Sequence, residues 1–344
     1  MRYLIYSTKY KKNIGDLSFI IEDYYKVLNN LKKYPNISRK YIFIEVGPEE
    51  IDKIRIACSK RYYVYIKQLY ESSEDYKVKN HIYDELIGCR GTMEALKLAL
   101  GEKGVVYHLG GGYHHASRSR AGGFDYLNDI VYAIESCRST MSIERVLIID
   151  LDVHFPDGIY DTYYRDENIY LFSIHGWGIF PGRGWIYDCG IGKAKYTKWN
   201  IPLPKGITGH YYLEALYRFL PEIISMAEPE VVIYQAGVDV LHNDELGNLR
   251  LTLKDVYLRD KYVYEEVVKR NKLPLVVVAG GGYSLDTYKA RINTLAALGE
   301  EDLVFDDTLT LTCSAQTIEK YNKWCSMVEA LIKKAKNKNK SQDC

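Results

Sequence analysis

Short apolar runs alternate with longer amphipathic stretches over most of this 344-residue chain. The apolar runs are rich in Val, Ile and Leu and cover residues 41–46, 104–109, 146–151, 169–174, 231–234 and 275–279. Stretches with the periodicity of amphipathic helices lie between or beside them, at residues 51–70, 92–100, 126–137, 210–226, 254–269 and 285–298. Buried strands separated by helices indicate a parallel sheet with helices on both faces. We therefore predict an α/β fold.

The two ends of the chain show less of this pattern. Residues 1–40 are predicted to be peripheral to the sheet, and residues 318–332 to form a helix. No repeat and no linker rich in Pro, Gly or Ser divides the chain, so we predict a single domain over residues 1–332. The lysine-rich residues 333–344 are predicted to be a disordered basic tail.

Composition excludes several function classes. A net charge of +1 gives no overall field towards nucleic acid or an anionic membrane, so we expect nucleic-acid contact only weakly, through the basic tail. The sequence contains no run of about 18 apolar residues, so no transmembrane helix is predicted. The N-terminus lacks the apolar core of a signal peptide. The seven cysteines include no CxxC pair and are typical of reduced thiols. We expect a cytoplasmic protein.

Polar or glycine-rich motifs directly follow five of the predicted strands. They are residues 110–115, 150–154, 173–175, 239 and 280–283. Open parallel sheets place their active sites beyond the carboxyl ends of the strands. We therefore expect these motifs to meet at one edge of the sheet.

Asp152 and His154 are the first candidates for metal ligands. They are two residues apart at a strand end, so their side chains point to the same face. Asp239, after another buried strand, is the best-placed third ligand. Three protein ligands leave a position open for water and substrate, as catalytic zinc requires. Either Asp152 or His154 alone is more often a structural side chain, but the combination at strand ends favours a metal site.

Adjacent histidines and one tyrosine are the candidates for proton transfer and charge stabilisation. An activated water needs a general base and a leaving amine needs a general acid, and the pKa of histidine suits both roles, which points to His114 and His115. Asp150 and Asp157 are nearby carboxylates that could orient the two imidazoles. Tyr283 follows three glycines and could donate a hydrogen bond to a developing oxyanion. The glycine run would also suit a phosphate loop, but neither GxxxxGK[ST] nor a GxGxxG that opens a helix is present.

Together these motifs resemble the zinc-dependent histone deacetylase superfamily, which includes bacterial and archaeal deacetylase-like amidohydrolases. The matching blocks occur in the family's order at residues 111–116, 123–129, 149–158, 180–184, 235–239 and 280–283. The resemblance covers roughly residues 40–300. It implies a three-layer arginase/deacetylase-type α/β fold with a central, mostly parallel sheet of about eight strands. It also makes residues 1–332 a single deacetylase-like catalytic domain.

The resemblance assigns roles to individual residues. Zn²⁺, or Fe²⁺ in its place, would be held by Asp152, His154 and Asp239. His115 paired with Asp157 would be the main general base and acid, and His114 paired with Asp150 would assist electrostatically. Tyr283 would polarise the amide carbonyl together with the metal. The tunnel for the acylated side chain would be lined by Gly123, Phe124, Phe180 and Gly281. A structural K⁺ would lie beside Asp150, bound by the carbonyls of Asp152, His154 and Ile174 and the hydroxyl of Ser173.

The implied activity is the removal of acetyl or similar acyl groups from lysine side chains of proteins. An acetylpolyamine or another small acylated amine is the alternative substrate, although no long insertion that would close the tunnel is present. Two other possibilities remain. The first is a non-catalytic binder of acyl-lysine. The second is a binuclear, arginase-like hydrolase with Asp244 as an extra ligand, which metal stoichiometry would distinguish.

Two segments depart from the family pattern, and one family residue has no clear counterpart. Asp125 stands where many eukaryotic members have cysteine, so a carboxylate lies next to the acyl pocket unless it caps the following helix. Phe155-Pro156 replaces a small or polar pair, and proline restricts the backbone just before Asp157. Glu74 and Asp75 are candidates for the acidic rim residue that anchors the peptide backbone in some members.

Overall fold

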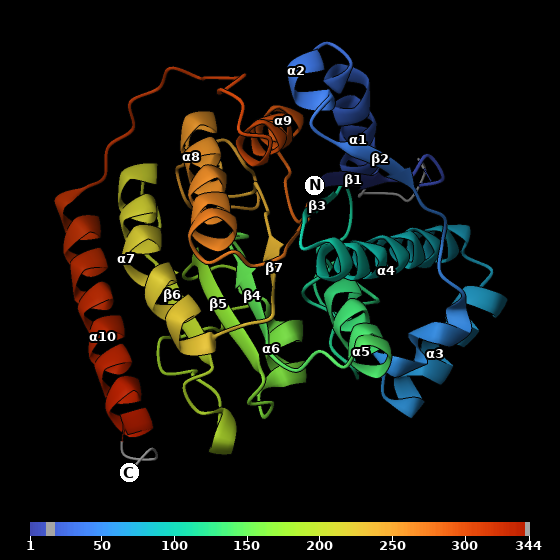
Figure 1. Cartoon of the computed structure of the whole chain (residues 1–344), viewed down its shortest axis with the longest axis horizontal. Coiled ribbons are helices and arrows are strands. Elements are labelled where there is room, and N and C mark those ends of the chain that lie inside the picture. Colours follow the sequence, from blue (N-terminus) through green and yellow to red (C-terminus); the bar gives the residue numbers. More distant parts are fainter. Residues whose placement is uncertain (12–17, 341–344) are drawn as a thin grey trace.

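A single eight-stranded sheet, all of whose strand pairs are parallel, forms the centre of the computed structural model, which describes residues 1–11 and 18–340 (Figure 1). The strands are β1 Arg2–Tyr6, β2 Ile42–Glu45, β3 Val105–His108, β4 Val146–Asp150, β5 Ile169–Gly176, β6 Lys198–Leu203, β7 Val231–Gln235 and β8 Leu275–Val278. Their order across the sheet is β2-β1-β3-β8-β7-β4-β5-β6. The predicted α/β fold is confirmed, and the strand number agrees with the family resemblance.

Helices form a layer on each face of this sheet. The helices are α1 Ser18–Leu31, α2 Pro35–Ser38, α3 Lys60–Ser72, α4 Tyr76–Glu102, α5 Asp129–Met141, α6 Asp157–Tyr163, α7 Gly209–Ala227, α8 Leu253–Tyr264, α9 Thr287–Leu298 and α10 Ala315–Lys340, with the short elements η2 Ile51–Ile56, η3 Gly192–Ala194 and η4 Glu265–Arg270. One set of helices in mutual contact comprises α1, α9, α8 and α7, and another comprises α3, α4, α5 and α6. In Figure 1, α7, α8 and α10 stand on one side of the view, and α3, α4 and α5 on the other.

The central strands form because their residues are apolar on both faces. Every residue of β3, β4, β7 and β8 is buried. This is expected for a parallel sheet whose two faces are both covered by helices. On α7, Leu213, Leu216, Leu220 and Ile224 are buried at helical spacing, so one stripe of that helix packs inward. Thr252 and Asp255 close a capping box that fixes the start of α8.

Two strands differ from the prediction. β1 lies between β2 and β3, so the expectation that residues 1–40 are peripheral was wrong for Arg2–Tyr6, a five-residue run too short to stand out beside the lysines that follow. β6 was not predicted because Lys198, Asn200 and Pro202 interrupt its apolar pattern. The structure accommodates these residues at a sheet edge, where Asn200 Nδ2 donates to the carbonyl of Asp188 at 2.7 Å.

The C-terminal helix is longer than predicted. α10 continues past Ile332 to Lys340, so the expected disorder does not hold for residues 333–340, while residues 341–344 lie outside the described part. Spacing explains the difference, because Leu331, Ile332 and Ala335 are buried on one side of the helix. Weak contact of this segment with nucleic acid stays a prediction. None of the described helices combines the length and apolarity needed to span a bilayer.

Candidate metal and catalytic centre

The carboxyl ends of neighbouring strands bring the candidate residues together. β3, β8, β7, β4 and β5 are adjacent in that order, and each leads into one of the predicted motifs. In the register, Asp150 lies opposite Gln235 on one side and Ser173 on the other. The expectation that these motifs share one edge of the sheet is therefore confirmed.

Asp152, His154 and Asp239 form a buried cluster. One ligand atom from each lies within 4.8 Å of the others. His154 Nδ1 is 3.1 Å from Asp152 Oδ1 and 3.0 Å from Asp239 Oδ2. No Lys or Arg among the described residues forms an ion pair with either carboxylate, and buried carboxylates need a counter-charge. Two carboxylates and one imidazole therefore fit a divalent cation such as Zn²⁺.

Backbone and amide groups hold these three side chains in place. The backbone N–H of Val153 donates to Asp239 Oδ1 at 2.8 Å. Asp152 Oδ2 accepts from the N–H of Gly281 at 3.0 Å and from Gln235 Nε2 at 3.1 Å. Gln235 was not predicted as a site residue, although a buried amide at the end of the apolar strand β7 is a signal that could have revealed it.

Gly281 was predicted to line the substrate tunnel, and it also touches the ligands. A Cβ at this position would lie 2.6 Å from Asp239 Oδ2 and 2.7 Å from Asp152 Oδ2. These distances are below van der Waals contact, so only glycine lets the backbone approach both carboxylates.

The two histidines meet tip to tip beside this cluster. His114 Nε2 lies 3.0 Å from His115 Nε2, so one nitrogen donates and the other accepts. His114 Nδ1 is 2.9 Å from Asp150 Oδ2, and His115 Nδ1 is 2.7 Å from Asp157 Oδ1. Both expected pairings are present, and Phe155-Pro156 does not displace Asp157.

The two imidazoles differ in proton affinity. Burial opposes charge on His114, but the carboxylates of Asp150 and Asp152 outweigh it and raise the pKa of His114 to about 10. Burial and the charge of His114 lower the pKa of His115 to about 4. His115 is therefore the neutral partner, and its Nε2 accepts while Nδ1–H donates to Asp157.

Arg120 is a neighbour of this pair that the sequence analysis missed. Its Nη2 donates to Asp157 Oδ2 at 2.8 Å and to Asp161 Oδ2 at 2.8 Å. One oxygen of Asp157 thus accepts from Arg120 and the other from His115. No local sequence pattern predicts this contact, because it depends on how the loop of residues 117–122 packs against the start of α6.

A small cavity of about 60 Å³ opens onto the cluster and the histidines. It is lined by Tyr24, His81, Gly111, Gly112, Tyr113, His114, His115, Phe124, Asp125, Asp152, Gly280, Gly281 and Tyr283. The ring of Phe124 lies 6.2 Å from that of Tyr283, and the ring of Phe180 lies 4.8 Å from that of His115. Gly123 has a φ of +55°, and a Cβ there would lie 2.6 Å from His115 Cδ2. All four predicted lining residues are therefore at or beside this cavity.

Tyr283 and Asp244 are joined by a hydrogen bond. The backbone N–H of Tyr283 donates to Asp244 Oδ2 at 2.7 Å, while the N–H groups of Leu246 and Gly247 donate to Oδ1. Asp244 is thus a loop-organising residue, and it is not part of the ligand cluster found among the described residues. Burial and the carboxylates of Asp239 and Asp152 raise the pKa of Tyr283 well above its usual range, so its phenol keeps a proton to donate.

The residues predicted to bind K⁺ lie together at the ends of β4 and β5. Asp150 and Ser173 are directly paired across the two strands, and Ser173 Oγ is 2.8 Å from His175 Nδ1. The ion itself stays a prediction. The two rim candidates lie elsewhere, because neither Glu74 nor Asp75 lines the cavity, and Asp75 caps the N-terminus of α4.

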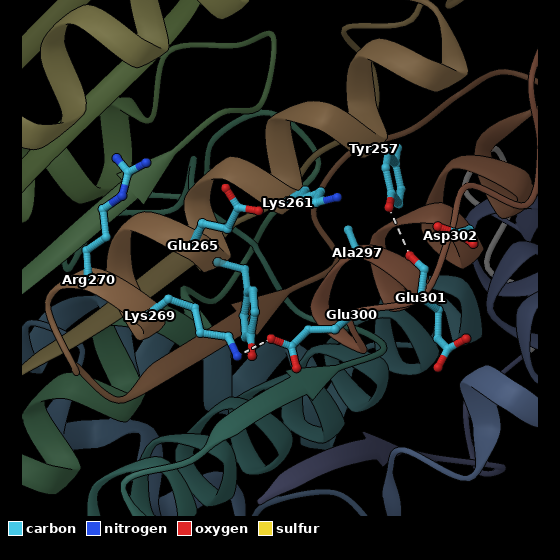
Figure 2. Close-up of a pocket in the computed structure, with 10 residues that line it drawn as sticks. Tyr257, Lys261, Glu265, Lys269, Arg270, Ala297, Glu300, Glu301 and Asp302 are labelled. Atoms are coloured by element: carbon cyan, nitrogen blue, oxygen red, sulfur yellow. Dashed lines mark hydrogen bonds and ion pairs between the residues drawn. The ribbon is translucent and has the colours of Figure 1, made fainter.

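A wider pocket of about 430 Å³ lies between α8, η4 and the end of α9 (Figure 2). Two interactions join residues that line it. Lys269 forms an ion pair with Glu300, and the hydroxyl of Tyr257 donates to the carbonyl of Glu301 at 2.9 Å, as the dashed lines show. It contains none of the predicted site residues, so the smaller cavity is the candidate active site.

Comparison with known proteins gives the same assignment. The sequence model of the histone deacetylase domain matches residues 23–298. Histone deacetylase HDAC1 of Drosophila melanogaster is 36% identical over 221 residues, which are 63% of this chain and 41% of that protein. Histone deacetylase 1 of Homo sapiens is 38% identical over 193 residues, 56% of this chain and 38% of that protein. Histone deacetylase 8 of Xenopus tropicalis is 33% identical over 215 residues, 61% of this chain and 56% of that protein. The match thus spans between about two fifths and just over half of these relatives' lengths. From its motifs, its fold and this match, the chain belongs to the histone deacetylase family.

Proposed function

We propose that this chain is a zinc-dependent amidohydrolase that removes acetyl or similar acyl groups from lysine side chains of proteins. The observation that carries the proposal is the buried Asp152–His154–Asp239 cluster beside two histidines, each of which contacts its own carboxylate. A non-catalytic binder would not need this arrangement of buried charges, which costs folding free energy. Fe²⁺ would suit the same ligands.

Asp152, His154 and Asp239 would hold the metal, and the cavity side would stay open for water and substrate. A divalent ion held there lowers the pKa of a water molecule and polarises the acyl carbonyl. The N–H groups of Val153 and Gly281 keep the two carboxylates oriented.

His115 moves the protons in this proposal. Its Nε2, which accepts from His114 in this structure, would exchange that bond for the attacking water and take a proton from it as the water oxygen bonds to the carbonyl carbon. Asp157 accepts from Nδ1–H and stabilises the imidazolium that forms. The same proton then passes to the lysine nitrogen as the C–N bond breaks, which releases a neutral amine and a carboxylic acid.

Tyr283 and His114 stabilise charge. The Tyr283 phenol donates to the oxyanion that develops on the carbonyl oxygen. His114, charged through Asp150, assists electrostatically from beside His115. A K⁺ ion beside Asp150, with Ser173 and the carbonyls of Asp152, His154 and Ile174 as ligands, would fix the ends of β4 and β5.

We place the protein in the cytoplasm. The six cysteines within the described residues are all free, which suits a reducing compartment.

The proposal is tested by supplying the purified zinc-loaded protein with an acetyl-lysine peptide and with N-acetylputrescine in parallel, with a chelator control. We expect acetate release from the peptide that the chelator abolishes. Preference for N-acetylputrescine would move the protein to the alternative function, an acylated-amine hydrolase. No acetate release from either compound would contradict the proposed activity.

A further inference from the structure

The carboxyl group of Asp125 has one oxygen left for a ligand. Asp125 Oδ2 accepts from the backbone N–H of His115 at 2.8 Å. In the part of the chain that the structure describes, Oδ1 has no hydrogen bond, and Asp125 lines the cavity. It does not cap α5, because Asn128 fills that role by accepting from the N–H of Val131. The side chain therefore belongs to the wall of the active site.

The surroundings of Asp125 favour its protonated, uncharged form. Burial and the nearby Glu85 raise the pKa of Asp125 well above its usual range. Glu85 itself is fully occupied, since it accepts from the N–H groups of Tyr126 and Leu127 and lies 3.3 Å from His81 Nε2. No Lys or Arg from residues 1–11 or 18–340 pairs with Asp125. Oδ1 can accept a hydrogen bond from a ligand in the cavity when the carboxyl is ionised, and a donor bound there would stabilise that ionised form.

The cavity has exposed aromatic residues beside it and polar residues in its wall. Phe124 and Phe180 are 46% and 50% exposed, so a lysine side chain would enter past their rings. Tyr24, only 4% exposed, lines the cavity together with Tyr113, His81 and Asp125. With this entry, the part of the acyl group beyond its carbonyl would lie among these polar residues. The 60 Å³ of the cavity holds roughly four water-sized groups, so only a short acyl group fits.

We propose that the acyl group this enzyme prefers carries a hydrogen-bond donor on the carbon next to its carbonyl, a hydroxyl or an amino group, which Asp125 receives. The inference rests on the proposed function and names the substrate class of the same site. The hydrolytic step is unchanged, because water still adds to the carbonyl and the C–N bond breaks. Asp125 adds selectivity, since a site built to pair with a polar group disfavours an analogue that lacks it.

Four versions of one peptide test this, with lysine carrying a glycolyl, glycyl, propionyl or acetyl group. Glycolyl and propionyl differ by a hydroxyl in place of a methyl, so their shapes match. We expect kcat/KM for glycolyl or glycyl to exceed that for propionyl by about 10-fold or more, as one hydrogen bond to a carboxyl group in the cavity allows. In Asp125→Ala this preference disappears. Asp125→Asn keeps an acceptor for the His115 N–H but places an NH₂ donor at the Oδ1 position. This NH₂ can still donate to the oxygen of a hydroxyl but has no attraction for an ammonium, so the variant separates the two groups.

Equal turnover of propionyl and both polar peptides by the wild type would overturn the inference. So would an equal loss on all four peptides in Asp125→Ala, which would show that Asp125 only supports His115. These results differ from failure of the proposed function, in which no peptide would show chelator-sensitive hydrolysis.

An independent observation concerns Lys198, a fully buried lysine on β6. Its Nζ donates to the carbonyls of Ile169 at 2.5 Å and Asp166 at 3.0 Å, and to Thr197 Oγ1 at 2.7 Å. Among the described residues no carboxylate forms an ion pair with it. Burial lowers the pKa of Lys198 to about 7, but three acceptors match the three N–H bonds of an ammonium and favour the charged form.

Carbonyl and hydroxyl oxygens without a carboxylate are the ligands of a monovalent cation. We infer that the Lys198 ammonium is a built-in cation that occupies such a site and ties the loop before β5 to β6. Removal of the side chain should then open the site to K⁺ or NH₄⁺. Lys198→Met provides a matched control, because it fills the same space without a charge.

The test compares Tm for wild type, Lys198→Ala and Lys198→Met in KCl, NH₄Cl and tetramethylammonium chloride at equal ionic strength. In tetramethylammonium chloride, whose cation is too large for the site, we expect the Tm of Lys198→Ala to be several degrees below that of wild type. K⁺ or NH₄⁺ should raise the Tm of Lys198→Ala by more than they raise the Tm of wild type or of Lys198→Met. A salt response of Lys198→Ala no larger than that of wild type or Lys198→Met would overturn the inference.

Discussion

Replacing His115 with alanine lowers kcat for deacylation about 100- to 10,000-fold, while bound metal stays near the wild-type amount. In the proposed mechanism His115 Nε2 takes and returns the proton, whereas the candidate ligand cluster of Asp152, His154 and Asp239 does not include His115. Turnover by the purified variant and its metal content, measured on the same sample, check the prediction.

His114→Ala is the matched control, since it removes an equally buried imidazole next in the sequence. Its expected effect on kcat is smaller, because His114 assists without moving the proton. A His115 variant that loses metal together with activity, or one whose kcat stays within a few-fold of wild type, would contradict the assigned role.

Gly281→Ala has the second large effect, through the metal ligands. The new Cβ would lie 2.6 Å and 2.7 Å from the Asp239 and Asp152 carboxylates, so these side chains must shift. Disturbing the groups that orient metal ligands typically weakens metal affinity about 10- to 100-fold. Zinc affinity measured by competition with a chromophoric chelator should show this loss, and activity should recover at high zinc.

Gly101→Ala serves as the control for this substitution. Gly101 lies in α4, where a Cβ would have no atom within 4 Å, so zinc affinity should be unchanged. Wild-type zinc affinity in Gly281→Ala would show that the backbone approach at Gly281 does not constrain the ligands.

The sequence predicted those parts of the site where chemistry and strand pattern coincide. Asp152 and His154 follow β4, whose first four residues are apolar, so the residues that form this strand also place the candidate ligands beyond its end. Asp239 could be added because parallel strands share one active edge. The fold class followed from the same pattern.

What was missed depends on contacts between distant segments. Arg120 reaches Asp157 only because the loop after His115 packs on the start of α6. β6 was hidden because Lys198 and Asn200 are buried polar residues, and their partners are backbone carbonyls that no residue pattern encodes. β1 lies in the segment that was predicted to be peripheral, yet two neighbouring strands hold it inside the sheet.

The most direct test of the account is a titration of the metal-free protein with zinc while acetate release from an acetyl-lysine peptide is followed. Activity should be absent without metal and should rise to its maximum at one equivalent of zinc, and Asp239→Asn should show no such rise at the same zinc concentration. Full activity without metal, or a requirement for a second equivalent, would contradict a single zinc held by Asp152, His154 and Asp239.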